Sequence, residues 1–263
     1  MFNKNPVIFT LMNSSYKTLA GRILVVLMLI SLVSATRKPR FNVLVLTSKA
    51  KDHINMMAAA APMLQKMADD NHFKVDITDD TSKISDENLK NYKVFVMLQL
   101  APFDMSYAQQ DALQKFAEDG KGWVGIHAAG LTGRQFKPNN KYWQWFEGFM
   151  GNVTYSPHPK FQKGTVIIED RNSPITKGLP EKMEVSDEWY EFDHSPRNDV
   201  HVLATADEST YTQRKPMGDH PIMWTNPKFR RMVYIGIGHD SSLCRNPDYV
   251  KLLHNSIEWA ASK

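Results

Sequence analysis

Short apolar runs along the chain alternate with longer segments whose apolar residues recur at helical spacing. Residues 41–47 form an almost wholly apolar run, which is typical of a strand buried on both faces. Residues 54–70 follow, rich in Ala, Met and Leu at helical spacing. The alternation continues with strands expected at 73–78, 92–98 and 122–127, and with helical segments at 86–91 and 106–119, the last ended by Gly120. Strands separated by helices predict βαβ units with right-handed crossovers, and therefore a parallel sheet.

The pattern changes after Leu131. Residues 134–159 are rich in aromatic side chains and poor in regular periodicity. Strands are expected at 164–169, 183–192, 200–205, 221–225 and 230–237, and a closing helix at 248–261. The middle segment also holds Trp143, Trp145, Phe146 and Phe149, which we interpret as core rather than as a binding platform. The sequence shows no internal repeat, so we expect one α/β domain over residues 36–263, with the middle segment as an elaboration over the sheet.

The first 35 residues carry a different pattern. Lys17 and Arg22 precede an apolar run at 23–33, and Val33-Ser-Ala35 supplies the small residues of a cleavage site. This order of basic, apolar and small residues predicts a secretory signal peptide over residues 1–35. A spanning helix needs about 20 apolar residues, and this run is shorter. We expect an exported protein, periplasmic or secreted, with no stable membrane span after cleavage; the alternative is an anchor formed by an uncleaved N-terminal helix.

Charge and cysteine content exclude several classes of protein. The net charge is +4, but six basic residues and no acid lie in the first 40 positions, so 26 basic and 28 acidic side chains remain from Phe41 onward. The folded part therefore has no basic excess, and we expect no nucleic-acid partner. The single cysteine, Cys244, excludes an internal disulfide and a cysteine-based zinc site, and we expect a buried, unreactive thiol. The sequence also lacks the glycine-rich loops that bind nucleotide cofactors.

Polar residues follow several of the expected strands, and ligands bind at the carboxyl ends of strands in an open parallel sheet. His127 ends the strand at 122–127 and precedes two alanines that permit a sharp turn, so we favour a functional role over a structural one. His239 follows Gly-Ile-Gly, and an ordinary loop histidine is the alternative. Glu188 lies among aromatic residues, an arrangement that suits sugar binding, although a solvated edge strand would show the same residues.

Other candidates are weaker. Within the expected strand at 183–192, alternation places Glu188 and Tyr190 on one face and Asp187 on the other. His53 follows the first strand and a basic loop, and an ordinary histidine at a helix start is favoured for it. His158 lies between two prolines, where a rigid loop could hold an imidazole in place or act only as a spacer.

Several ordered and separated stretches together resemble the ThuA-like (trehalose utilisation) family, from about Phe41 to the C-terminus. They are Gly125-Ile-His-Ala-Ala129, Gly151 with His158-Pro159, Asp187-Glu-Trp-Tyr190, Pro221-Ile-Met-Trp224, Gly236-Ile-Gly-His239 and Ile257-Glu-Trp-Ala260. The resemblance implies a flavodoxin-like α/β fold similar to class I glutamine amidotransferases, with a mostly parallel sheet, helices on both faces and a site at the strand ends. It also places His127 where amidotransferases carry their nucleophilic cysteine, so glutaminase chemistry is not expected.

The resemblance implies a role in carbohydrate catabolism, and we expect an exported protein that acts on a disaccharide, glycoside or keto-sugar derivative, as a hydrolase or lyase. His127, His239 and Glu188 are the expected catalytic residues. Residues assigned to substrate binding are His53, Asp187, Tyr190, His158 and Trp224. A non-catalytic carbohydrate-binding or accessory protein is the alternative, and exposed aromatic residues leave a homo-oligomer open. No metal ligand is assigned: a divalent metal is not favoured, because the histidines lack a local spacing such as His-x-x-x-His.

Overall fold

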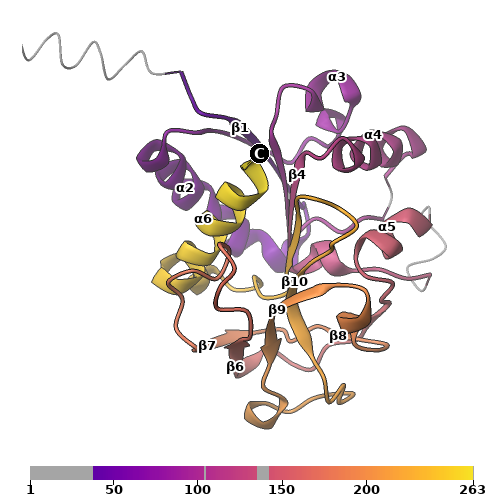
Figure 1. Ribbon diagram of the computed structural model, residues 1–263, viewed down its shortest axis with the longest axis vertical. Helices are drawn as coiled ribbons and strands as arrows, with labels where there is room; N and C mark the ends of the chain where they lie inside the picture. Colours follow the sequence, from indigo (N-terminus) through magenta and orange to yellow (C-terminus); the bar gives the residue numbers. More distant parts are fainter. Residues whose placement is uncertain (1–37, 104, 135–141, 263) are drawn as a thin grey trace, which may run out of the picture. The chain divides into compact units, whose positions relative to one another are not determined.

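The computed structural model describes residues 38–103, 105–134 and 142–262 (Figure 1). Arg40–Lys263 forms one compact unit. The expected signal peptide at 1–35 lies outside the described residues. Within the described part of the chain, no helix is both long enough and apolar enough to cross a membrane.

The central sheet has nine strands in the order β2-β1-β3-β4-β11-β10-β9-β6-β7. Their bounds are β1 Asn42–Thr47, β2 Lys74–Thr78, β3 Val94–Leu98, β4 Gly122–Ile126, β6 Gln162–Ile168, β7 Lys182–Asp187, β9 His201–Ala206, β10 Pro221–Thr225 and β11 Met232–Ile235. The helices are α2 Ile54–Asn71, α3 Asp86–Leu89, α4 Tyr107–Glu118, α5 Gln144–Phe149 and α6 Pro247–Ala261. A separate pair of two-residue strands, β5 Tyr155–Ser156 and β8 Glu191–Phe192, lies outside the central sheet.

The first half of the sheet is parallel and covered on both sides. Strands β2, β1, β3, β4 and β11 pair in parallel, in the strand order of flavodoxin-like folds. Alternate residues of β1 enter different cores: Val43 and Val45 pack with α2 and α6, whereas Leu44 and Leu46 pack with α3, α4 and α5. In Figure 1, α2 and α6 accordingly lie on one side of the strands and α4 and α5 on the other. The predicted α/β flavodoxin-like fold with helices on both faces is confirmed.

The second half of the sheet is an antiparallel extension. Strand β10 pairs antiparallel with β11 and with β9, and β6 pairs antiparallel with β9 and with β7. Buried and exposed residues alternate along β7, as expected for a strand with one covered face. This extension brings the carboxyl end of β7, Asp187, into hydrogen-bond contact with the loop after β11, at Gly238.

Two expectations about secondary structure are corrected. Residues 183–192 do not form one strand, because β7 ends at Asp187 and Glu191–Phe192 pairs instead with β5. The ladder ends at Asp187, opposite the first residue of β6, and the Asp187 side chain accepts the backbone N–H of Glu188. The irregular segment 134–159 contains a helix, α5, whose Phe146 and Phe149 are buried, so the interpretation of these two side chains as core is confirmed.

Candidate functional site

Four segments that are distant in sequence bring together three histidines and one glutamate. His53 lies in the short helical turn after β1, His127 follows β4, His239 follows β11, and Glu188 follows β7. One ligand atom from each of the four residues lies within 4.8 Å of those of the other three. We call these four residues the His/Glu cluster. The three histidines stand at carboxyl ends of parallel strands, where ligands bind in sheets of this kind.

His127 is held in one orientation at the centre of the cluster. It is fully buried and has a φ of +51°, a left-handed conformation that turns its side chain out of the line of β4. Its Nδ1 atom lies 2.9 Å from the carbonyl oxygen of Gly236. Because a carbonyl can only accept, Nδ1 carries a proton and donates it. That Nε2 atom has no hydrogen-bond partner among the described residues and lies 3.4 Å from Oε2 of Glu188.

The close approach of the strand ends depends on a residue without a side chain. A Cβ atom at Gly238 would lie 2.6 Å from Cγ2 of Ile126 and 3.4 Å from Cβ of His127. The carbonyl oxygen of Gly238 accepts a hydrogen bond from the side-chain amide of Gln99, at the end of β3. Glycine therefore lets the loop after β11 pack directly against the end of β4, which places His239 beside His127.

The buried side chain of Asp187 contacts two residues of the loop after β11 and the ring of His127. Its side chain is fully buried and accepts the backbone N–H groups of Gly238 at 2.8 Å and His239 at 3.2 Å. Its Oδ1 atom also lies 3.6 Å from Nδ1 of His127. Burial raises the pKa of the Asp187 carboxyl. Asp187 was expected to bind substrate; in the structure its side chain is fully buried and positions His239 and His127.

The Glu188 carboxylate is surrounded by imidazole nitrogens. Its Oε2 atom lies 3.2 Å from Nδ1 of His239, 3.4 Å from Nε2 of His127 and 3.4 Å from Nε2 of His158. Burial acts to raise the pKa of Glu188, but the imidazoles of His127 and His239 outweigh it, and the pKa lies below its ordinary value. Conversely, the contact with Glu188 raises the pKa of His239. Burial and the neighbouring His127 and His239 lower the pKa of His53 to about 4.

Two further predicted residues border the cluster. The ring of Tyr190 lies 4.0 Å from that of His127, centroid to centroid, and is almost fully buried. His158 stacks on Tyr190 at 5.4 Å, and its Nδ1 atom lies 2.7 Å from the carbonyl oxygen of Pro159. The proline-bounded loop thus holds the His158 imidazole against Glu188.

Phe161 is a neighbour of the cluster that the sequence did not indicate. Its side chain is 45% exposed, and its ring centroid lies 5.7 Å from that of His239. A single phenylalanine in a loop carries no periodic signal, so only the fold shows that it borders the cluster. An exposed apolar ring beside a group of polar side chains is suited to stacking against the apolar face of a sugar.

Trp224 does not reach the cluster, and its assignment to substrate binding is corrected. It lies in the middle of β10, is fully buried, and packs against Tyr234 at 4.6 Å and Phe192 at 5.5 Å. Neighbouring strands and their aromatic side chains enclose it, so it belongs to the core between the sheet and helices α4 and α5.

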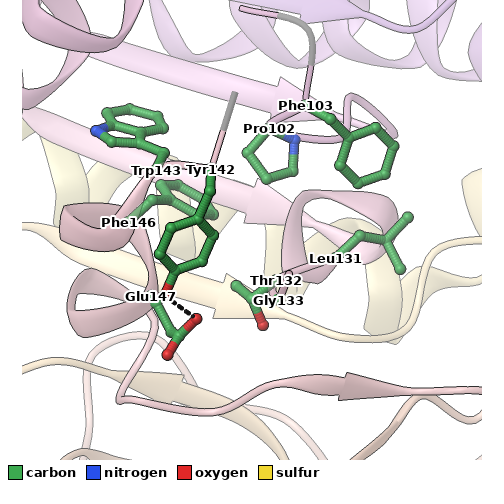
Figure 2. Close-up of a pocket in the computed structure, with 9 residues that line it drawn as sticks. All are labelled: Pro102, Phe103, Leu131, Thr132, Gly133, Tyr142, Trp143, Phe146 and Glu147. Carbon is green, nitrogen blue, oxygen red and sulfur yellow. Dashed lines mark hydrogen bonds between the residues drawn. The ribbon is translucent and has the colours of Figure 1, made fainter. Parts of the chain in front are cut away.

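One small cavity lies beside the aromatic side chains of α5 (Figure 2). Its volume is about 20 Å³, which leaves room for about one water molecule and not for a sugar ring. Its lining is Pro102, Phe103, Leu131, Thr132, Gly133, Tyr142, Trp143, Phe146 and Glu147. The Glu147 carboxylate accepts a 2.7 Å hydrogen bond from the hydroxyl of Tyr142, as Figure 2 shows, so this acid is already paired.

Comparison with known proteins agrees with the fold. The family model for trehalose utilisation, ThuA, matches residues 42–260. A ThuA-like protein from Bacteroides uniformis is 32% identical, and its crystal structure superposes with a TM-score of 0.77, covering 87% of this chain and 94% of that one. A second ThuA-like protein, from Parabacteroides merdae, is 18% identical with a TM-score of 0.64, covering 86% and 91% of the two chains.

Amidotransferase-like proteins share the fold at lower identity. A protein from Thermoplasma acidophilum described as a GMP synthase component is 14% identical, with a TM-score of 0.53 and coverage of 84% of this chain and 94% of that one. At this identity the likeness shows the fold alone, as it does for the Parabacteroides merdae protein. Among curated proteins none matches this chain.

Proposed function

This chain belongs to the trehalose utilisation (ThuA) family, and we propose that it is an exported enzyme that acts on a disaccharide, glycoside or keto-sugar derivative at the His/Glu cluster. Family membership implies a role in carbohydrate metabolism. The finer proposal, of catalysis at one site, draws on the geometry of His127, His239 and Glu188.

The observation that carries the proposal is the convergence of Glu188 with imidazole nitrogens at a partly open site. The side chains of Glu188 and His239 are each 19% exposed, whereas His127 beneath them is fully buried. A small molecule can therefore reach the carboxylate and one imidazole from solvent. Removing a proton next to a ketone, or adding water to a glycosidic carbon, requires groups of this kind. The carboxylate and the imidazoles can transfer protons themselves, or they can hold a metal ion that activates a water molecule or a substrate oxygen.

The surroundings of the cluster suit a sugar. Phe161 offers an exposed ring beside His239, and Tyr155 and His158 lie around Tyr190, at ring distances of 4.9 Å and 5.4 Å. An aromatic face can take the apolar face of a pyranose, while imidazole and carboxylate groups take its hydroxyl groups. In this arrangement the sugar ring stacks on Phe161, and its reacting carbon points toward Glu188.

The proposal is tested by incubating the purified protein with a panel of disaccharides and their keto derivatives, and following products by chromatography. We expect turnover of at least one compound, and a loss of at least about 100-fold in kcat in Glu188→Gln. The matched control is His201→Asn, which removes a surface histidine paired with Asp170. Saturable sugar binding without any turnover would instead support the non-catalytic carbohydrate-binding alternative.

Export is tested separately. The proposed signal peptide predicts that the protein recovered from the periplasm or the medium begins at Thr36, after Val33-Ser-Ala35. Mass spectrometry of the mature N-terminus measures this. Retention of residues 1–35 on a membrane-bound protein would support the uncleaved anchor instead.

A further inference from the structure

We propose that His53, His127, His239 and Glu188 together bind a divalent transition-metal ion of the zinc class. The inference concerns the same cluster as the proposed function but does not depend on the sugar chemistry, because metal binding is measured without a substrate. All four residues meet in the group whose ligand atoms lie within 4.8 Å of one another.

The first argument is the state of the His127 ring. Its Nδ1–H donates to the carbonyl oxygen of Gly236, and its buried Nε2 atom lies 3.4 Å from Oε2 of Glu188 with no hydrogen-bond partner among the described residues. A hydrogen bond from Nδ1–H to a backbone carbonyl is also the usual arrangement behind a histidine that ligates a metal.

The second argument is the spacing of the donor atoms. Hydrogen bonds between an imidazolium and a carboxylate are about 2.7–2.9 Å long. Oε2 of Glu188 lies farther than this from each of its imidazole neighbours, at 3.2 Å from Nδ1 of His239, 3.4 Å from Nε2 of His127 and 3.4 Å from Nε2 of His158. Ligands bound to zinc at about 2.0–2.1 Å in a tetrahedron are about 3.3 Å apart. The observed separations match the edge of such a tetrahedron better than they match a proton bridge.

Other histidine–carboxylate pairs of the described chain cover a range of distances. Three are as short as direct hydrogen bonds: His201–Asp170 at 2.8 Å, His194–Asp193 at 3.0 Å and His220–Glu208 at 3.1 Å, whereas His254 lies 4.0 Å from Glu258. Glu188 differs from these acids because three imidazoles, those of His127, His158 and His239, lie 3.2–3.4 Å from one of its oxygens. Buried nitrogens of His53, His127 and His239 also lack hydrogen-bond partners among the described residues.

The chemistry of the donors sets the class of ion. Imidazole nitrogen suits zinc, copper, iron and nickel, whereas magnesium and calcium prefer sets made of oxygen atoms. Three imidazoles and one carboxylate therefore favour a first-row transition metal. The Asp187 carboxylate lies 3.6 Å from Nδ1 of His127 and accepts the backbone N–H of His239. One buried side chain therefore positions both histidines. Since Glu188 and His239 are partly exposed, an ion can enter from solvent, and a ligand can approach it.

The test is a binding titration on the full mature chain. The protein is stripped with a chelator, and Zn²⁺ is titrated in competition with a chromophoric chelator; Co²⁺ is then added to record its visible absorption. We expect one Zn²⁺ per chain and a Co²⁺ spectrum of low-symmetry, four- or five-coordinate type. Glu188→Gln and His53→Asn should each weaken Zn²⁺ binding by at least about tenfold, whereas the matched control His201→Asn should leave it unchanged.

The outcomes separate this inference from the proposed function. If Zn²⁺ does not bind, or binds with the same affinity in Glu188→Gln and His53→Asn, the metal site is refuted, even where sugar turnover is found. If Zn²⁺ binds and depends on both residues while no sugar reacts, the metal site stands and the proposed function fails. Circular dichroism of each variant shows whether it is folded. Glu188→Gln and His53→Asn change different segments of the chain, so one of them can still be measured if the other does not fold.

Discussion

The Nε2 atom of His127 lies 3.4 Å from Oε2 of Glu188 and has no hydrogen-bond partner among the described residues. The two residues come from opposite halves of the sheet, since His127 follows a parallel strand and Glu188 follows the antiparallel edge strand β7. Their meeting depends on the contact of Asp187 with the loop after β11. The site therefore forms only when the chain is folded, and the residues that position it, Gly238 and Asp187, can be tested by separate substitutions.

Gly238→Ala tests the close approach of the strand ends. The new Cβ would lie 2.6 Å from Cγ2 of Ile126, so the loop after β11 must shift. We expect the variant to be less stable by about 1–3 kcal/mol, measured by urea unfolding, and to bind Zn²⁺ more weakly. Gly148→Ala is the control, because its Cβ would meet no atom closer than 3.7 Å. Equal losses of stability in the two variants would contradict this role of Gly238.

Asp187→Asn tests the support behind the cluster. The amide keeps the shape of the side chain but replaces one acceptor oxygen by an N–H donor, which would face the backbone N–H groups of Gly238 or His239. We expect a loss of about 1–3 kcal/mol in unfolding free energy, and Zn²⁺ binding weaker by about tenfold. Asp80→Asn, at an exposed turn, is the control. A variant with unchanged Zn²⁺ affinity would mean that Asp187 has only a structural role.

Much of the fold could be predicted from the sequence because its signals are local. The run of apolar residues in β1 and the helical spacing in α2 determine each element within its own segment. The short helix α5 was missed because it has only six residues, too few for a helical period to show in the sequence. The single strand expected at 183–192 was wrong because β6, the partner of β7, begins at Gln162 opposite Asp187, so the ladder ends there.

The candidate site was only partly predictable. The sequence showed a polar residue at each of these strand ends. No local spacing indicated that His53 would lie beside His127 and His239. Because of this missing spacing, a metal site was not favoured. Trp224 belongs to a family motif, yet its place in the middle of β10 puts it in the core. Phe161 could not be recognised, because its position beside His239 follows from the packing of loops that are distant in sequence.

Phe161→Ala tests the proposal that a sugar ring stacks on the side chain of Phe161. Its ring is 45% exposed and borders His239, so its removal should affect substrate binding more than stability. For a compound that is turned over, we expect KM to rise by about threefold to tenfold, in line with about 0.5–1.5 kcal/mol for an aromatic contact, with kcat and Zn²⁺ affinity little changed. Tyr107→Ala removes another exposed aromatic side chain and should leave KM unaltered. An unchanged KM in Phe161→Ala would place the sugar elsewhere.

Arg197 is expected to make stability depend on pH in the acid range. Its guanidinium group contacts Asp219 at 2.6 Å and Glu169 at 2.9 Å, and these contacts hold the pKa of both carboxyls below their usual values. A lowered pKa in the folded state stabilises the protein above the pKa of the unfolded state, and the gain is lost as the pH falls through the folded-state pKa.

Arg197→Gln should therefore lower the Tm at pH 7 by about 2–4 °C, which corresponds to about 1 kcal/mol for a partly exposed network. The difference from the unaltered protein should shrink as the pH falls below about 4, where Glu169 and Asp219 of the unfolded chain take up protons, and it should vanish once the same carboxyls are protonated in the folded state. Lys163→Gln is the control, since its partner Glu184 is largely exposed. A difference in Tm that is constant from pH 7 to pH 3 would show that Arg197 acts by packing alone.

The central claim is that the four side chains of the His/Glu cluster hold one metal ion. Anomalous diffraction from crystals of the protein loaded with Zn²⁺, recorded on both sides of the zinc absorption edge, tests it most directly. We expect a single peak about 2.0–2.2 Å from Nε2 of His127, Nδ1 of His239 and a carboxylate oxygen of Glu188, with His53 beside it. A cluster without a peak, in which Glu188 and the imidazoles are joined by direct hydrogen bonds, would contradict the claim.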